Sequence, residues 1–184
     1  FFRIILIPVF LIVFYLPLTW SHFGAAFVFW LASISDALDG YIARKLKQST
    51  PFGAFIDPVA DKLMVVSALV ILVEDYQTWW VSIPALIMIG REVLVSALRE
   101  FMASRGKRDS VAVSTMGKYK TAAQMLAIMG LIWQPDYEIP LIFFHLPAWV
   151  INYAAYAFFF IATVLTFWSM FIYMKASVKE LMAN

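Results

Sequence analysis

The stretch Trp149–Met174 reads WVINYAAYAFFFIATVLTFWSMFIYM and contains no Asp, Glu, Lys or Arg. A helix needs about 20 mainly apolar residues to cross the hydrocarbon core of a bilayer, and this stretch is long enough. Five further runs of similar character precede it. They are Ile4–Trp20, Phe23–Lys45, Phe52–Val73, Trp79–Arg99 and Thr121–Trp133, the last extended backward by Lys118–Lys120. We therefore expect an all-α, polytopic membrane protein with six transmembrane helices.

The composition of the chain excludes several classes of protein. Of its 184 residues, 63% are hydrophobic and 14% are charged, whereas a water-soluble domain carries about 25% charged residues. The absence of Cys rules out a disulfide framework and a thiolate metal site. The net charge is only +2, and the basic residues separate apolar runs instead of forming one polar face, which argues against nucleic acid as a partner. We expect one membrane domain over residues 1–184.

The distribution of Lys and Arg predicts the orientation, because short connections rich in them stay in the cytoplasm. Basic residues occur at both ends and in alternate connections, whereas the connections 21–22, 74–78 and 134–148 contain none. We expect the inner (cytoplasmic) membrane of a cell, with both termini and the active site on the cytoplasmic side. Because Phe1 is not a Met, we also expect further residues upstream. Aromatic rings that favour the headgroup level mark the outer ends of the runs, at Trp20, Trp79, Trp80, Trp133 and Trp149.

Four aspartates interrupt the second and third apolar runs near their inner ends, although ionisable residues within spans are costly and by default functional. They are Asp36, Asp39, Asp57 and Asp61. Residues three or four apart share one face of a helix, so each pair of aspartates lies on one face. Two antiparallel helices joined by a short loop can bring the four carboxylates together. The alternative is that they cap helices or pair with nearby cations, which are Arg44, Lys45 and Lys62.

Four neighbouring carboxylates need positive charge, because like charges at short range cannot all ionise alone. Their total charge of −4 is balanced by two divalent cations, and Mg²⁺ or Mn²⁺ prefers oxygen ligands of this kind. The acidic cluster therefore predicts a two-metal centre, an arrangement that suits phosphoryl displacement.

The aspartates belong to a longer pattern: Asp36-x-x-Asp39-Gly40-x-x-Ala43-Arg44, then eight residues, then Gly53-x-x-x-Asp57-x-x-x-Asp61. The pattern resembles the signature of the CDP-alcohol phosphotransferase family, and every fixed position is filled. The resemblance implies six membrane helices and two divalent ions, Mg²⁺ or Mn²⁺, held by the four aspartates. It implies that Asp61 is also the catalytic base for the acceptor hydroxyl. It further implies that the CDP-lipid is bound by Gly40, Ala43, Arg44 and Gly53.

The remaining sequence indicates the two substrates. The segments Arg91–Arg99 and Gly117–Gln124 resemble bacterial members of the family that join CDP-diacylglycerol to glycerol 3-phosphate and release CMP. An acceptor phosphate needs cations in a cavity of the inner leaflet, because burying an unpartnered dianion is costly. The candidate cations are Arg91, Arg99, Lys118 and Lys120. Glu92 is expected to pair with a cation on another helix, since adjacent helical residues do not face each other.

Other interpretations stay open at this point. Serine, inositol phosphate or phosphatidylglycerol as the acceptor would use the same metal centre. A cation or proton transporter would also carry carboxylates within the membrane, although the outer halves of the spans are almost free of charge, which favours a site open only to the cytoplasm. The charge-free run Trp149–Met174 faces membrane lipid or forms a dimer contact, and we expect a homodimer.

Overall fold

The computed structural model describes residues 2–46, 51–105, 115–137, 139–140 and 145–182. Within these residues the chain forms six helices and one two-residue antiparallel ladder, which pairs Ile139 with Leu146 and Pro140 with His145. The all-α class is therefore confirmed for the described part of the chain. In chain order the elements are α1 (Phe2–Tyr15), α2 (Ser21–Leu46), α3 (Pro51–Tyr76), α4 (Trp79–Ser104), α5 (Thr115–Trp133), β1 (Ile139–Pro140), β2 (His145–Leu146) and α6 (Ala148–Met182).

Several helix boundaries differ by a few residues from the apolar runs that predicted them, and two of the differences have a clear local reason. The first run was expected to continue to Trp20, but α1 ends at Tyr15. The reason is local, because the next residue precedes Pro17, and a residue before proline is pushed out of the helical region. At the other end of the chain, α6 continues past the apolar run to Met182. The added residues are mostly Ala, Lys, Glu and Leu, which favour a helix outside the apolar region as well.

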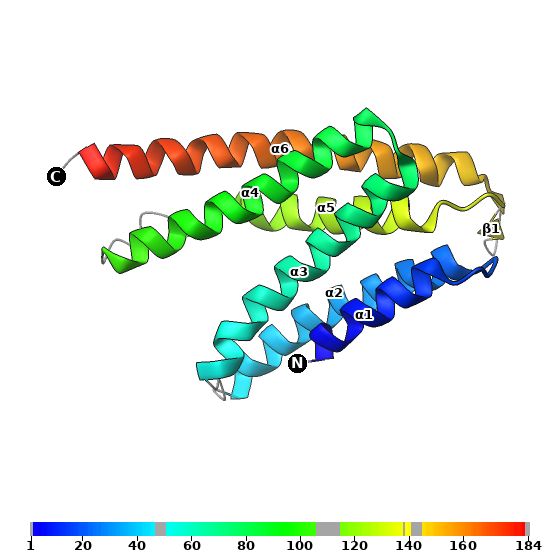
Figure 1. Cartoon of the computed structure of the whole chain (residues 1–184), viewed down its shortest axis with the longest axis horizontal. Coiled ribbons are helices and arrows are strands. Elements are labelled where there is room, and N and C mark those ends of the chain that lie inside the picture. The colour runs from blue at the N-terminus through cyan, green and yellow to red at the C-terminus, as the bar shows by residue number, and fades with distance from the viewer. Residues whose placement is uncertain (1, 47–50, 106–114, 138, 141–144, 183–184) are drawn as a thin grey trace.

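The helices form a bundle with two chemically different ends (Figure 1). The starts of α1, α3 and α5 and the ends of α2, α4 and α6 lie at one end, which we call the polar end. The α1–α2 and α3–α4 connections and β1 lie at the opposite end. Helix α5 packs against α6 and α2, α1 against α2 and α3, and α4 against α6 and α3. The parts of α2, α3, α4 and α5 that carry the predicted site residues therefore share the polar end.

The core contains side chains from every helix. Gly130 of α5 permits a close approach to α6, because a Cβ atom placed there would lie 2.7 Å from the Cβ atom of Ala155. Small residues at such crossings are typical of helices packed within membranes. The fully buried side chains include Phe10, Phe29, Leu69, Met88, Ile128 and Phe159, one from each helix in turn.

Two helices have both the length and the apolar composition needed to cross a membrane, namely α4 and the part of α6 from Ala148 to Lys175. Only 22% of the most apolar part of this α6 segment is buried, whereas a core helix of a soluble protein is mostly buried. Large apolar side chains such as Val164, Trp168 and Phe171 are exposed along it. The apolar parts of α1 and α2 among the described residues are shorter. The described apolar part of α2 spans Ser21–Ser35, and charged residues interrupt α3 and α5.

Candidate active site

The signature pattern that begins at Asp36 and ends at Asp61 occupies two consecutive helices. Asp36, Asp39, Gly40, Ala43 and Arg44 lie in the last part of α2, and Gly53, Asp57 and Asp61 lie in the first part of α3. These parts of the two helices converge at the polar end (Figure 1). Of the four aspartate side chains, the described part of the structure includes only that of Asp61. That the four carboxylates lie close together therefore stays a prediction. The convergence of the two helices at this end is compatible with it.

The side chain of Asp61 is paired with a cation from α1. Nη1 of Arg3 lies 3.1 Å from Oδ1 of Asp61. The Arg3 side chain is only 5% exposed, while that of Asp61 is 40% exposed. Desolvating a guanidinium is costly unless it is paired and hydrogen-bonded, so this contact accounts for the position of Arg3. It also places a positive charge beside the residue that was predicted as both metal ligand and base.

Sequence reasoning used Arg3 only to orient the chain and missed its contact with Asp61. A signal was present, since Arg3 is the only charged residue of an otherwise apolar helix. A charged residue within such a segment is by default a functional hypothesis with a partner elsewhere. The identity of that partner depends on the packing of α1 against α3, which no local pattern contains.

Three of the four predicted acceptor-binding cations lie near one another. Lys120 of α5 interacts electrostatically with Arg91 and Arg99 of α4 and with the carboxylate of Glu92 beside them. Its residue surface is only 2% exposed. The fourth candidate, Lys118, lies in the first turns of α5, and its side chain falls outside the described part. Helices α4 and α5 thus contribute to one cationic cluster, defined here as Arg91, Arg99 and Lys120.

Glu92 was expected to pair with a cation on another helix, and this expectation was wrong. Nη1 of Arg91 contacts Oε1 of Glu92, the next residue on the same helix. Both side chains are mostly buried, and both are long enough to bend toward each other although their Cβ atoms point in different directions. This pairing offsets the charge of Arg91. Among the described residues, neither Arg99 nor Lys120 forms an ion pair with a carboxylate.

The cationic cluster also contains hydrogen-bond donors that lack an acceptor. Nε of Arg91 and Nε of Arg99 are both buried, and neither has a hydrogen-bond partner within the described part of the chain. A buried donor without a partner is destabilising, and such groups call for an explanation such as an absent ion. Together with the buried ammonium of Lys120, the two donors fit an anion, and guanidinium groups bind phosphate oxygens well.

The carboxylates suit a hard divalent cation. Asp61 supplies oxygen ligands of the type that Mg²⁺ and Mn²⁺ prefer, and α2 and α3 present three more aspartates at the same end of the bundle. Among the described residues alone, no group of three or more His, Asp or Glu side chains is found. This result does not bear on the predicted centre, because three of its four carboxylates lie outside those residues.

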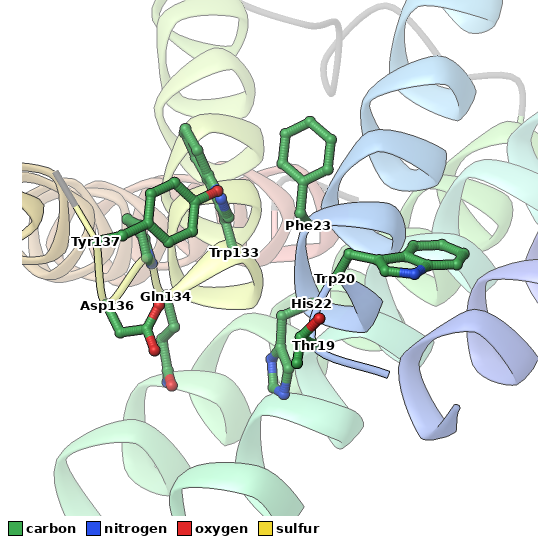
Figure 2. A pocket seen from close by; sticks show the side chains of 9 residues that line it. Thr19, Trp20, His22, Phe23, Trp133, Gln134, Asp136 and Tyr137 are labelled. Carbon is green, nitrogen blue, oxygen red and sulfur yellow. The ribbon is translucent and has the colours of Figure 1, made fainter. Parts of the chain in front are cut away.

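A separate cavity of about 610 Å³ lies at the end of the bundle opposite the polar end. The residues that line the cavity come from two places in the chain (Figure 2). Thr19 and Trp20 precede α2, and His22 and Phe23 lie in its first turn; Trp133 ends α5, and Gln134, Asp136 and Tyr137 follow it. Nδ1 of His22 lies 3.2 Å from the carbonyl oxygen of Ile132, which gives this histidine a structural role. None of the predicted site residues lines the cavity, so the candidate active site is at the polar end.

The CDP-alcohol phosphatidyltransferase family model matches residues 1–168, and the chain belongs to this family. The match includes every position of the signature in α2 and α3, so the family resemblance is confirmed. The chain is similar to the "CDP-diacylglycerol--glycerol-3-phosphate 3-phosphatidyltransferase" of Escherichia coli strain K12, with 52% identity over 181 residues. That alignment covers 98% of this chain and 93% of the relative. Proteins of the same name from Shigella sonnei and Shigella flexneri are also 52% identical to this chain, and the alignments cover the same fractions of this chain and of the relative.

Proposed function

We propose that this protein is an enzyme of phospholipid synthesis that transfers the phosphatidyl group of CDP-diacylglycerol to glycerol 3-phosphate. The products are phosphatidylglycerophosphate and CMP. The observation that carries the proposal is the 52% identity, over nearly the full length of both chains, to proteins named for this reaction. The cationic cluster supports a phosphate-bearing acceptor, because it combines a buried Lys120 with the Nε–H groups of Arg91 and Arg99, which have no hydrogen-bond partner among the described residues.

The reaction is a displacement at the phosphorus atom that carries the diacylglycerol. The acceptor hydroxyl oxygen forms a bond to this phosphorus, and the bond from the phosphorus to the oxygen that bridges it to CMP breaks. The electron pair of the broken bond leaves with CMP. Asp61 accepts the proton of the acceptor hydroxyl, and Arg3 holds the Asp61 carboxylate in place.

The signature residues bind the nucleotide lipid and the metal ions. We assign the two divalent cations, Mg²⁺ or Mn²⁺, to Asp36, Asp39, Asp57 and Asp61. When bound, the ions offset negative charge on the phosphoryl oxygens. Arg44 binds the pyrophosphate, and Gly40, Ala43 and Gly53 leave room for the cytidine group because their side chains are small or absent.

The acceptor enters the cationic cluster. Arg99 and Lys120 bind its phosphate, Arg91 contributes through its unpaired Nε–H group, and Lys118 lies within two residues of Lys120. Charge-assisted hydrogen bonds of this type are stronger than neutral ones. A phosphate is therefore favoured over a neutral alcohol of similar size.

All six helices cross the membrane in this proposal, with the polar end in the cytoplasm. The arrangement is supported by the shared end at which α1, α3 and α5 begin and α2, α4 and α6 end (Figure 1), and by the basic residues that lie near these helix ends in the sequence. The membrane is the inner, cytoplasmic one, where the exposed side chains of α6 contact lipid or a second copy in a homodimer.

An acceptor panel tests the proposal directly. The purified protein in detergent–lipid micelles is given CDP-diacylglycerol, Mg²⁺ or Mn²⁺, and one acceptor at a time: glycerol 3-phosphate, serine, inositol phosphate or phosphatidylglycerol. We expect CMP release and a phosphatidyl product with glycerol 3-phosphate. Efficient turnover of another acceptor, with none of glycerol 3-phosphate, would overturn the acceptor assignment. Ion flux through vesicles without CMP release would favour a transporter.

A further inference from the structure

Arg99 makes a two-part contact with an aromatic residue of another helix. Its Nη2 group donates a hydrogen bond to the hydroxyl oxygen of Tyr173 over 3.3 Å. The same guanidinium lies over the Tyr173 ring, with Cζ 5.5 Å from the ring centroid. The two residues are 74 positions apart in the sequence and connect α4 with α6. One side chain thus contacts the guanidinium through both its hydroxyl group and its aromatic ring.

The contact fixes the one guanidinium of the cationic cluster that has no carboxylate partner among the described residues. Arg91 is held by Glu92, which also offsets its charge. Tyr173 is neutral, so it holds Arg99 without offsetting the charge. No carboxylate among the described residues pairs with Arg99, and its buried Nε–H group has no partner in the same part of the chain. An ordered guanidinium with a spare donor is well suited to bind phosphate.

We propose that Tyr173 is a positioning residue that orders Arg99 for the acceptor phosphate and thereby favours phosphate-bearing acceptors. This inference rests on the proposed function, because it assigns a role within the proposed acceptor site. Its physical basis is preorganisation: a long side chain that is already ordered loses less conformational freedom when its ligand binds. Tyr173 acts through Arg99 and takes no part in the transfer of the phosphatidyl group.

Two substitutions separate the two parts of the contact. Tyr173→Phe removes the hydroxyl and keeps the ring, and Tyr173→Leu removes both. In the full chain, Tyr173→Phe should raise the KM for glycerol 3-phosphate about 2- to 10-fold, the loss expected for one hydrogen bond. Tyr173→Leu should raise it about 10-fold or more because the cation–π contact is also lost. The KM for CDP-diacylglycerol should stay within about twofold in both variants, as expected if only the acceptor subsite is changed.

A matched control is available on the same helix. Tyr153 lies near the start of α6, toward the opposite end of the bundle, and is 70% exposed. Tyr153→Phe and Tyr153→Leu should leave both KM values unchanged. Equal effects of the Tyr153 and Tyr173 substitutions, or an equal rise of both KM values in the Tyr173 variants, would overturn the positioning role.

A double-mutant cycle tests whether Tyr173 acts through Arg99. If it does, Tyr173→Leu should add little to the KM of Arg99→Ala, since coupled residues are not additive. Fully additive effects would contradict the proposal. A second measurement that does not depend on turnover is the thermal stabilisation of the protein by glycerol 3-phosphate, which should need a higher concentration in Tyr173→Phe than in the wild type.

The same experiments distinguish failure of the proposed function from failure of the proposed role of Tyr173. Wild-type protein that neither uses nor binds glycerol 3-phosphate would refute the proposed function, and the role of Tyr173 would be refuted with it. Wild-type protein that uses glycerol 3-phosphate, with an unchanged KM in Tyr173→Phe and Tyr173→Leu, would refute only the role of Tyr173.

Discussion

At the scale of single residues, the contact between Arg3 and Asp61 links the first helix to the acidic cluster. Arg3 is buried, and its guanidinium lies 3.1 Å from Asp61. Partners that orient a metal-binding carboxylate are nearly as important as the ligand, and their loss typically lowers metal affinity or activity about 10- to 100-fold. The assignment of Asp61 as ligand and base therefore extends to Arg3 as the residue that orients it.

The first prediction concerns Arg3→Ala. We expect activity to fall about 10- to 100-fold, and half-maximal activation to require more Mg²⁺ or Mn²⁺, because the Asp61 carboxylate loses the group that orients it. Arg3→Lys keeps the positive charge and should retain more activity than the alanine variant. The measurement is CMP release as a function of metal concentration. Metal activation curves of both variants that match the wild type would show that the contact has no functional role.

The second prediction concerns the carboxylates themselves. Asp57→Asn removes one proposed metal-binding charge, and Asp61→Asn also removes the proposed base. Each should lower the turnover rate by at least about 100-fold, the lower range for loss of acid–base catalysis. Elution of the purified variants as a single folded species is the control. Near-normal turnover of either variant, or full activity in the presence of a chelator, would contradict the two-metal mechanism.

At the scale of helices, the sequence predicts the elements better than their contacts. All six apolar runs correspond to helices, because the runs are long and the connections between them are short. The early end of α1 follows from Pro17, which the apolar run did not take into account. The contacts Arg3–Asp61 and Arg99–Tyr173 join residues 58 and 74 positions apart, and they depend on which helices pack together. The four aspartates stand out as charges within apolar runs, and the roles of the other signature residues follow from the family resemblance. The contacts made by Arg3 and Tyr173 could not be predicted from either.

The third prediction concerns the crossing of α5 and α6. In Gly130→Ala the new Cβ atom would lie 2.7 Å from the Cβ atom of Ala155, so the two helices must move apart. We expect a loss of about 1–3 kcal/mol in stability, as is typical of overpacked sites, measured as a lower midpoint of thermal unfolding in detergent. Gly90→Ala is the matched control, because a Cβ atom there meets no other atom within 4 Å.

The two glycine substitutions should change stability in opposite directions. Alanine favours a helix by about 1 kcal/mol over glycine, so Gly90→Ala should keep or raise the unfolding midpoint. Ala155→Gly should partly restore the midpoint of Gly130→Ala, since it removes the clashing Cβ atom. An equal change in both single variants would show that helix propensity, and not the approach of α5 to α6, determines the result.

At the scale of the whole molecule, the separation of the two ends has a functional consequence. The signature residues lie in the last part of α2 and the first part of α3, which share the polar end (Figure 1). Arg99 lies in the last part of α4 and Lys120 in the first part of α5, toward the same end. The opposite end contains exposed aromatic residues such as Trp20, Trp79 and Trp149, and its connections carry no Lys or Arg. Charged, water-soluble glycerol 3-phosphate and CMP can therefore enter and leave at the polar end, while the lipid substrate stays in the membrane.

The last prediction tests this orientation in intact cells. The chain has no Cys, so a single introduced thiol is labelled without background. A cysteine at Gln77, an exposed residue between α3 and α4, should react with an impermeant thiol reagent added from outside. A cysteine at Lys107, in the basic connection between α4 and α5, should react only after the cells are opened, because Lys and Arg keep short connections in the cytoplasm. The reverse pattern would place the signature residues on the outer face and would overturn the proposed orientation.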